Sequence, residues 1–344
     1  MGALGAPDPR QVDGLGGADM LLSKVAIVAR SASTDADVEC EFANMTPGKD
    51  RPTYGTNCGN LVAAVALFAV GEGLVAADSG APAVRIRNRN SGGLIEAHIG
   101  ALDARASKSF RLAGMPDTGA CVDLDFLEPV GSTQSLLLPT GNVRETIRLE
   151  NGKSADISVI DAGALYVFVK AKDLGLSAAE TAEQLQNAPG AMDDLERLRA
   201  EAAKMIGLVE STADATLATP DVPKLAIVGP AVSYRCDASS TEVASESIDL
   251  VSRIVSSQKY HKAYAVTGAI ATAAAATIEG STVYEAVGGC MGTGLQEVRI
   301  GHPSGVMACE VENRTSAGNH DIARARIRRT ARQVMQGTVF VPSL

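Results

Sequence analysis

The sequence predicts an α+β protein made of two similar domains, each with a strand followed by a buried central helix. In the first half, a β-branched run at residues 23–28 precedes an apolar stretch at residues 61–70. In the second half, residues 223–228 and 266–276 repeat this order. β-Branched runs favour strands, and segments that are apolar all round favour buried helices. The repeat therefore predicts two homologous domains, and the alternative is chance similarity between Val/Ala-rich segments.

The two halves set the expected domain boundaries. We expect the first domain to cover residues 1–150 and the second domain to cover residues 151–322, with residues 323–344 returning to the first. Residues 177–206 are charged and amphipathic, with Pro189 and Gly190 in the middle. This pattern predicts a pair of surface helices that breaks at those two residues.

Composition narrows the class of protein. The 344 residues are 46% hydrophobic and 21% charged, which is typical of a soluble globular protein. Only 3% are aromatic, there is no Trp, and the formal net charge is −9. Few stacking side chains and a negative charge both oppose binding to a phosphate backbone, so we expect no nucleic acid partner.

The sequence shows no sign of a membrane, export or metal-binding role. No apolar run approaches the roughly 20 residues that cross a bilayer, and the N-terminus lacks the pattern of a signal peptide. Cysteines at positions 40, 58, 121, 236, 290 and 309 form no CxxC pair, which favours reduced thiols. Histidines at positions 98, 261, 302 and 320 show no metal-ligand spacing. We therefore expect a cytoplasmic protein without a bound metal.

The tetrapeptide Asn57-Cys58-Gly59-Asn60 directly precedes the first apolar helix. Asn57 can cap that helix, and Gly59 allows a ligand to approach the backbone closely. A cysteine at a helix N-terminus has its thiolate form favoured, which makes the sulfur reactive. Considered alone, such a cysteine is more often a small buried hydrophobic residue.

A glycine-rich segment, residues 14–19, lies just before Ser23 and Lys24. Its backbone N–H groups could surround a carboxylate. Lys24 opens an apolar strand and would be partly desolvated there, which suits a lysine to act as a base. A glycine-rich loop is weak evidence by itself, and a lysine at a strand end is usually just solvated.

Five segments taken together resemble one known family. Residues 11–28, 57–60, 139–142, 301–305 and 329–332 are similar, in this order, to the 2-methylaconitate cis–trans isomerase (PrpF-type) family. That family also contains 4-oxalomesaconate tautomerases, 3-methylitaconate Δ-isomerases and aconitate Δ-isomerases. The resemblance covers essentially the whole chain. It implies the diaminopimelate-epimerase-like fold, in which two pseudo-symmetric domains each wrap a β-sheet around a central helix and the active site lies in the cleft between them.

The same resemblance implies the chemistry. Lys24 and Cys58 correspond to the family's catalytic lysine and cysteine, and they would catalyse allylic proton transfer, a double-bond or cis–trans isomerisation, on an unsaturated di- or tricarboxylate without a cofactor. The partner would be a small polycarboxylate substrate, and a homodimer is compatible with this reading. We expect Arg329 and Arg332 to form surface salt bridges rather than to contact the substrate. Residues expected to bind the substrate are Gly17, Ala18, Ser23, Asn57, Gly59, Asn60, Asn142, His261, Lys262, His302, Ser304 and Gly305.

Two features leave alternatives open. The surroundings of His261 resemble the 2-methylaconitate type, whereas residues 11–19 are closer to the tautomerases, so the substrate is not decided. Family members also begin earlier, with a strand and an Arg-Gly-Gly-Thr-Ser-Lys-Gly loop. We expect the absence of that opening strand to expose a strand edge rich in Val and Ile. A non-catalytic, truncated paralogue that binds a carboxylate or a protein is therefore the alternative, and the presence of both Lys24 and Cys58 favours the enzyme.

Overall fold

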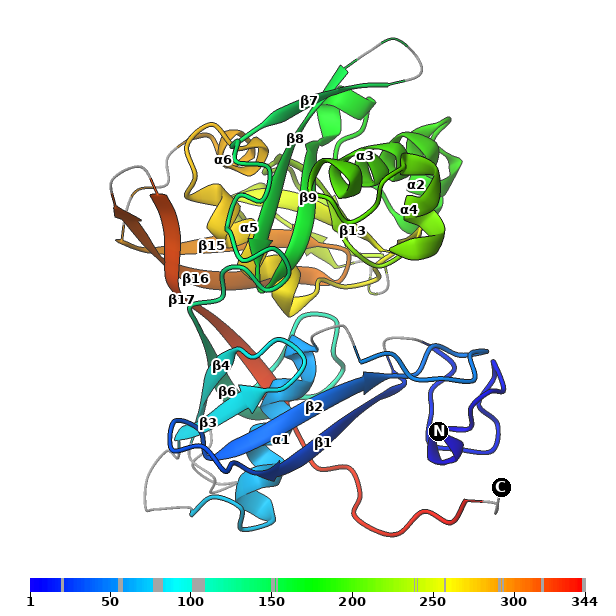
Figure 1. Cartoon of the computed structure of the whole chain (residues 1–344), viewed down its shortest axis with the longest axis vertical. Coiled ribbons are helices and arrows are strands. Elements are labelled where there is room, and N and C mark those ends of the chain that lie inside the picture. Colours follow the sequence, from blue (N-terminus) through cyan, green and yellow to red (C-terminus); the bar gives the residue numbers. More distant parts are fainter. Residues whose placement is uncertain are drawn as a thin grey trace. The chain divides into compact units, whose positions relative to one another are not determined.

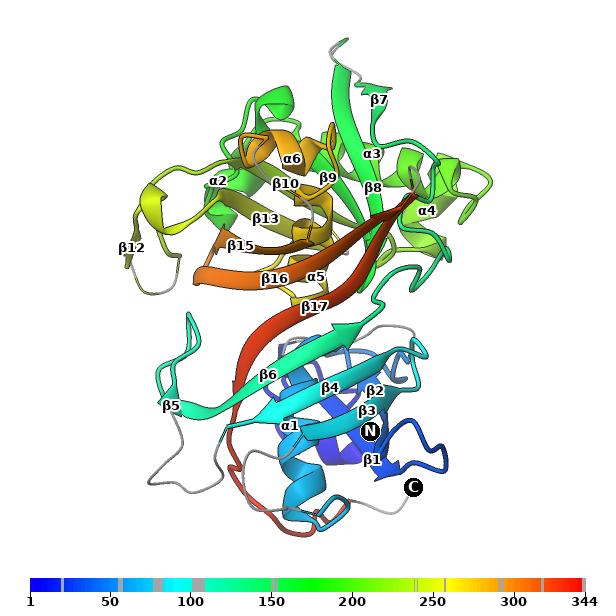
Figure 2. The ribbon, with the colours of Figure 1, turned by 90° about the vertical axis from the view of Figure 1, so that its left-hand side faces the viewer.

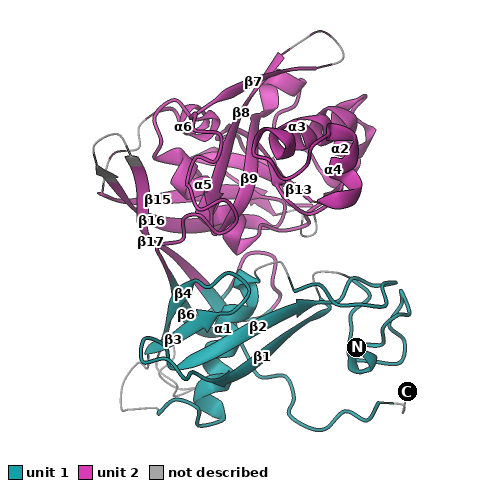
Figure 3. Ribbon diagram, in the orientation of Figure 1, with its two compact units in different colours: residues 1–111, 117–125, 329–344 teal, residues 112–116, 126–328 magenta. Residues whose placement is uncertain are grey.

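The computed structural model describes residues 1–19, 22–54, 58–76, 83–100, 109–149, 152, 154–237, 239, 241–256, 258–289, 292, 294–316 and 319–341. The chain divides into two compact units (Figure 3). Unit 1 comprises residues 1–111, 117–125 and 329–344, and unit 2 comprises residues 112–116 and 126–328.

The first segment of unit 1 ends at residue 111, whereas the sequence suggested a boundary at residue 150. Strand β7 (Glu145–Arg148) pairs in antiparallel fashion with β8 (Ser154–Ala162), so it belongs to the sheet of unit 2. At the other end of the chain, residues 329–344 belong to unit 1. Strand pairing rather than composition decides where each unit begins.

Unit 1 is a mixed sheet with one long helix (Figure 1). The pairing of β1 with β2 is antiparallel, with Lys24 opposite Asn44, and β2 pairs with β3 in parallel. The order of the main strands is β1 (Lys24–Arg30), β2 (Val38–Asn44), β3 (Ala83–Asn88), β4 (Leu94–Ile99) and β6 (Gly119–Leu127), while β5 (Ser109–Phe110) pairs with β6 and a 3-10 helix covers Gly2–Leu4.

Helix α1 (Gly59–Gly71) lies against strands β1, β3 and β4 of this sheet (Figure 2). The apolar stretch was predicted to be a buried helix, and the helix is confirmed. Its burial is one-sided: Val62, Ala63 and Ala66 are fully buried, whereas Phe68 is 49% exposed. The prediction of complete burial is wrong, because the strands of unit 1 cover one face of the helix.

Unit 2 contains more of the strands, again with a helix against them (Figures 1 and 2). A strand was predicted at residues 223–228, and β10 confirms it. It pairs with β9 in parallel and with β13 in antiparallel fashion. The strands run in the order β17 (Asn319–Ala331), β16 (Gly305–Ser316), β15 (Gly294–His302), β13 (Leu250–Ser256), β10 (Lys224–Pro230), β9 (Ala164–Lys170), β8 and β7; β14 (Lys259–Tyr260) pairs with β13, and β11 (Tyr234–Arg235) pairs with β12 (Glu242–Val243).

Helix α5 (Val266–Ala276) is the buried central helix of unit 2, as predicted. Every residue of it is buried, and it contacts β8, β9, β15 and β16. Small side chains allow this close packing: a Cβ on Gly268 would lie 2.7 Å from the Cδ1 of Ile254. The short helix α6 (Thr282–Ala286) packs beside it.

The charged segment forms the expected helices around a break. Helix α2 (Ala182–Asn187) ends before Pro189, and α3 (Ala191–Met205) begins after Gly190, which has a φ of 71°. Helix α3 buries Leu195 and Leu198 in the core of unit 2, as an amphipathic helix should. The remaining helical elements are α4 (Thr212–Ala218) and the 3-10 helices Ala171–Leu174 and Ser245–Ser247. Within the described ranges, no helix combines the length and apolarity needed to cross a membrane.

Candidate active site

The two residues predicted to be catalytic meet in unit 1. Lys24 is the first residue of β1, and Cys58 is the N-cap of α1, 34 positions later. The Nζ of Lys24 donates to the Sγ of Cys58 at 3.6 Å. Cys58 is 4% exposed, so the sulfur is shielded from bulk water. An amine and a thiol at this distance can share a proton, which is the arrangement that an acid–base pair requires.

The loop before Lys24 is organised around Gln11. This side chain is 3% exposed, and its Oε1 accepts hydrogen bonds from the backbone N–H of Ala18 at 2.8 Å and from the hydroxyl of Ser23 at 2.6 Å. A Cβ on Gly16 would lie 2.3 Å from the Cδ of Gln11. Close packing therefore accounts for glycine at position 16, and Gln11 links the loop to the residue that precedes Lys24.

The first turn of α1 carries a contact that the sequence analysis missed. The Nη2 of Arg329 donates to the Oδ1 of Asn60 at 2.8 Å, and Arg329 is 3% exposed. The expected surface salt bridge is therefore wrong for Arg329, because the end of β17 places it inside unit 1. Arg332, in contrast, forms the expected exposed ion pair with Asp117, at 3.5 Å. Asn57 lies outside the described residues.

In unit 2 the structure joins two of the predicted segments. The hydroxyl of Ser304 donates to the backbone oxygen of Lys262 at 2.6 Å. The Nδ1 of His302 accepts from the backbone N–H of Ser304, and the Nδ1 of His261 accepts from that of Ala263, both at 3.2 Å. In a neutral imidazole this leaves Nε2 as the protonated nitrogen. In that tautomer, Nε2 is the donor atom of both rings.

A buried tyrosine and arginine support the turn at residues 302–305. The hydroxyl of Tyr234 lies 2.7 Å from the backbone oxygens of both His302 and Gly305. Burial raises the pKa of Tyr234, so the hydroxyl stays protonated and can donate. Arg253 is fully buried, stacks on the Tyr234 ring at 4.9 Å and donates to the oxygen of Gly301 at 3.4 Å. Sequence alone offered only an arginine within an apolar strand as a signal of this network.

Asn142 is exposed in unit 2 and is held locally. Its Nδ2 donates to the Oε1 of Glu145 at 2.8 Å, and its backbone N–H donates to the hydroxyl of Thr140 at 3.2 Å. These bonds fix the amide on the turn that precedes β7.

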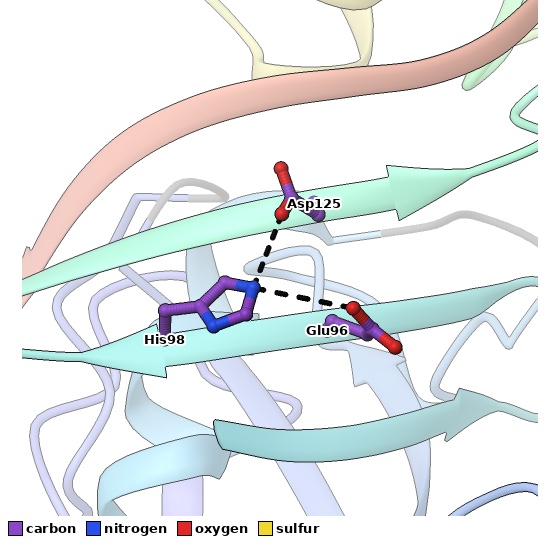
Figure 4. A group of neighbouring side chains, drawn as sticks. All are labelled: Glu96, His98 and Asp125. Atoms are coloured by element: carbon purple, nitrogen blue, oxygen red, sulfur yellow. Dashed lines mark hydrogen bonds and ion pairs between the residues drawn. The ribbon is translucent and has the colours of Figure 1, made fainter. Parts of the chain in front are cut away.

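A histidine and two carboxylates converge on one face of the unit 1 sheet (Figure 4). The Nε2 of His98 lies 3.1 Å from Asp125 and 4.0 Å from Glu96. The three potential ligand atoms lie within 4.8 Å of one another, which contrasts with the expectation that no histidine has ligand spacing. The missed signal is the Glu-x-His pattern, because alternate residues of a strand share a face. Arg85 also interacts electrostatically with Glu96, so its guanidinium would compete with a metal ion for that carboxylate.

Fold and site together define a class: a two-unit α+β protein with a lysine–cysteine pair in contact. The fold is also that of a hydroxyproline epimerase from Agrobacterium vitis, with a TM-score of 0.52, 14% identity, and coverage of 90% of this chain and 73% of that chain. Residues 1–342 match the family model described as PrpF protein. The chain therefore belongs to the PrpF family, as the sequence motifs predicted.

Individual relatives agree with this assignment. The chain is 35% identical to a 3-methylitaconate isomerase from Eubacterium barkeri, over 98% of this chain and 87% of the relative. It is 31% identical to a 4-oxalomesaconate tautomerase from Pseudomonas putida, over 99% and 87%. A crystal structure of methylitaconate-delta-isomerase has a TM-score of 0.82 and 34% identity, covering 98% of this chain and 86% of that chain. These similarities confirm the predicted fold.

Proposed function

We propose that this protein is a cofactor-independent isomerase that moves an allylic proton along an unsaturated di- or tricarboxylate. The observation that carries the proposal is the 3.6 Å contact between the Nζ of Lys24 and the Sγ of Cys58. Relatives that share about a third of the sequence are named as isomerases of 3-methylitaconate and 2-methyl-aconitate and as a tautomerase of 4-oxalomesaconate. Such acids share a carbon–carbon double bond next to carboxylate groups.

The pair can perform both halves of the reaction. The neutral amine of Lys24 removes a proton from the carbon beside the double bond, which leaves a dienolate. The thiol of Cys58 then gives its proton to the far carbon of the allyl unit. The pair ends as an ammonium on Lys24 and a thiolate on Cys58. The ammonium then gives a proton to the thiolate along the hydrogen bond between them, which restores the neutral amine and the thiol. The double bond has moved, and no atom has been gained or lost.

Hydrogen-bond donors are needed to stabilise the charge of the dienolate and to hold the carboxylates. In unit 1 we assign this role to Asn60 and the backbone of Gly59. His261, Lys262 and His302 belong to unit 2 and stay predicted donors to a carboxylate. Other residues of the predicted set shape the loops and turns that present these donors. They are Gly17, Ala18 and Ser23 around Gln11, and Asn142, Ser304 and Gly305 in the turns of unit 2.

The alternative of a non-catalytic binding module has no specific support. The described site keeps both members of the acid–base pair in contact, and the relatives named above are isomerases or a tautomerase. The cysteines at positions 40, 58, 121, 236 and 309 are free thiols, which favours the cytoplasm as the location; Cys290 lies outside the described residues.

A substrate screen tests the proposal. The protein is incubated in deuterium oxide with cis-aconitate, 2-methylaconitate or 4-oxalomesaconate, and NMR follows the double bond and the deuterium content. We expect one of the acids to isomerise with deuterium uptake at the allylic carbon, and Cys58→Ser to lose about 10²-fold or more of that activity. If none of the three acids isomerises or takes up deuterium, the proposal fails.

A further inference from the structure

The contact between Arg329 and Asn60 determines which way the Asn60 amide faces. A guanidinium has only donors, so the atom of Asn60 that lies 2.8 Å from Nη2 must be the carbonyl oxygen. In the opposite orientation, two N–H groups would face each other. Since the two ends of an amide point in different directions, the Nδ2 of Asn60 is turned away from Arg329.

The two side chains of this contact are buried to different extents. Arg329 is 3% exposed, whereas Asn60 is exposed, so the oxygen of the amide faces inward and its N–H₂ group faces outward. Asn60 lies in the first turn of α1, two residues after Cys58. The outward donor therefore belongs to the same helix start as the cysteine that we assign to proton transfer.

The charge in this region favours an anion near that donor. The guanidinium of Arg329 carries a permanent positive charge in a shielded position next to the first turn of α1. The N-terminal end of a helix adds partial positive charge in the same place, and the first turn of α1 contains no acidic residue.

We propose that Arg329 is a positioning residue that holds Asn60 as a hydrogen-bond donor for a substrate carboxylate, and so helps to select anionic substrates. The inference rests on the proposed function for the nature of the substrate. It differs from a purely mechanical role, in which Arg329 only ties the end of β17 to α1. The two roles predict different effects of changing the outward atom of residue 60.

Asn60→Asp separates the two roles. Arg329 can still donate to a carboxylate oxygen, so the link between β17 and α1 is kept and the fold should be retained. The outward atom, however, becomes a negatively charged acceptor in place of a donor, and it repels a second carboxylate. We expect the Kd for tricarballylate, a saturated tricarboxylate that cannot isomerise, to rise by about 100-fold, since like charges in a binding site cost several kcal/mol. The KM of the isomerised acid should rise in parallel, and kcat should change less.

Two further variants complete the experiment. Arg329→Gln offers an acceptor as well as a donor, so the amide of Asn60 is no longer held in one orientation, and the Kd should rise by about tenfold. Arg332→Gln is the matched control, because Arg332 belongs to the same end of the chain but forms only an exposed ion pair with Asp117. Its Kd should equal that of the unchanged chain. Circular dichroism and thermal melting verify that each variant is folded.

The outcomes separate this inference from the proposed function. An unchanged Kd and KM in Asn60→Asp would overturn the role of Arg329, and so would a lack of tricarballylate binding by the unchanged chain. Binding that weakens in Asn60→Asp supports that role even when no acid is isomerised, whereas failure of all three acids in the deuterium screen overturns the isomerase itself.

Discussion

The cysteines of this chain occupy different chemical environments. Cys40 is fully buried in β2, and this burial raises its pKa to about 12, so it stays a thiol at neutral pH. Cys58 is also shielded from water, but its sulfur accepts a hydrogen bond from the Nζ of Lys24. Alkylating agents react with thiolates, so the raised pKa of Cys40 should make this residue slow to react.

Iodoacetamide labelling with peptide mapping should therefore modify Cys58 much faster than Cys40. Tricarballylate should slow labelling at Cys58, because the thiol lies in the proposed substrate site. Cys58→Ser should keep the fold and lose about 10²-fold or more in turnover, the usual contribution of a general acid or base. Equally slow labelling at both positions, with full activity in Cys58→Ser, would show that Cys58 is only a packing residue.

The predictable part of the site is the part encoded locally. Lys24 and Cys58 each stand in a short motif, and these motifs were enough to single out both residues as candidates. The contacts of Asn60 with Arg329 could not be predicted, because they join residues 269 positions apart in the chain. The role of Gln11 was missed for a related reason: a glycine-rich loop suggests a ligand, whereas its glycines also allow close packing on a buried side chain.

At the scale of secondary structure elements, β1 is the end strand of the unit 1 sheet among the described residues. Its side chains Val25 and Ile27 are 37% and 53% exposed, and Leu22 just before it is 67% exposed. An apolar strand at a sheet edge is a site of aggregation, because it presents unpaired backbone groups together with apolar side chains.

Ile27→Lys should raise the soluble fraction on expression and slow aggregation at high concentration. Ile27 lies opposite Glu41 in the β1–β2 register, so the lysine also gains a cross-strand partner of opposite charge. The control is Leu217→Lys, which makes the same change on helix α4 at a residue that is 89% exposed. Light scattering from aggregates should fall only in Ile27→Lys. An equal fall in both variants would show that the strand edge is not the cause of aggregation.

The helices show how far apolar patterns predict burial. The stretch that forms α5 is buried at every position, because the strands of unit 2 and α6 pack around it. The equally apolar stretch that forms α1 leaves Phe68 half exposed. The pattern predicted both helices, but the number of neighbouring elements depends on strand pairing, which a local pattern does not contain.

At the scale of the whole molecule, unit 2 is tied together by a network of charges. Lys170 on β9 contacts Glu285 on α6 at 2.9 Å and Asp156 on β8 at 3.4 Å, and Arg144 bonds to both carboxylates. The hydrogen bond from Arg144, followed by that from Lys170, holds the pKa of Glu285 below its usual value of 4.5.

This lowered pKa gives a pH dependence with a defined sign. A carboxylate whose pKa is lower in the folded state stabilises the fold above the ordinary value, here 4.5, and loses that contribution as the pH falls. At neutral pH the Tm of Glu285→Gln should therefore lie below that of the unchanged chain, and the gap should narrow below about pH 4.5. Glu210→Gln, an exposed position after α3, controls for the loss of one carboxylate. A gap that widens in acid would contradict this assignment.

The division into units shows a limit of sequence reasoning at this scale. The predicted boundary at residue 150 followed the apparent repeat, but the pairing of β7 with β8 assigns residues 126–150 to unit 2. Such pairing depends on backbone hydrogen bonds, which any residue other than proline can make. The repeat of strand and helix therefore does not contain the information that places the boundary between the units.

The most direct test of the central claim is deuterium uptake in the variants of the acid–base pair. With the acid that the unchanged chain isomerises, NMR in deuterium oxide should show that Lys24→Ala abolishes both double-bond migration and exchange while the circular dichroism spectrum is unchanged. Lys24→Arg should recover little, because a guanidinium does not give up its proton near neutral pH. Near-normal exchange in either lysine variant would contradict the proposal that Lys24 and Cys58 transfer the proton.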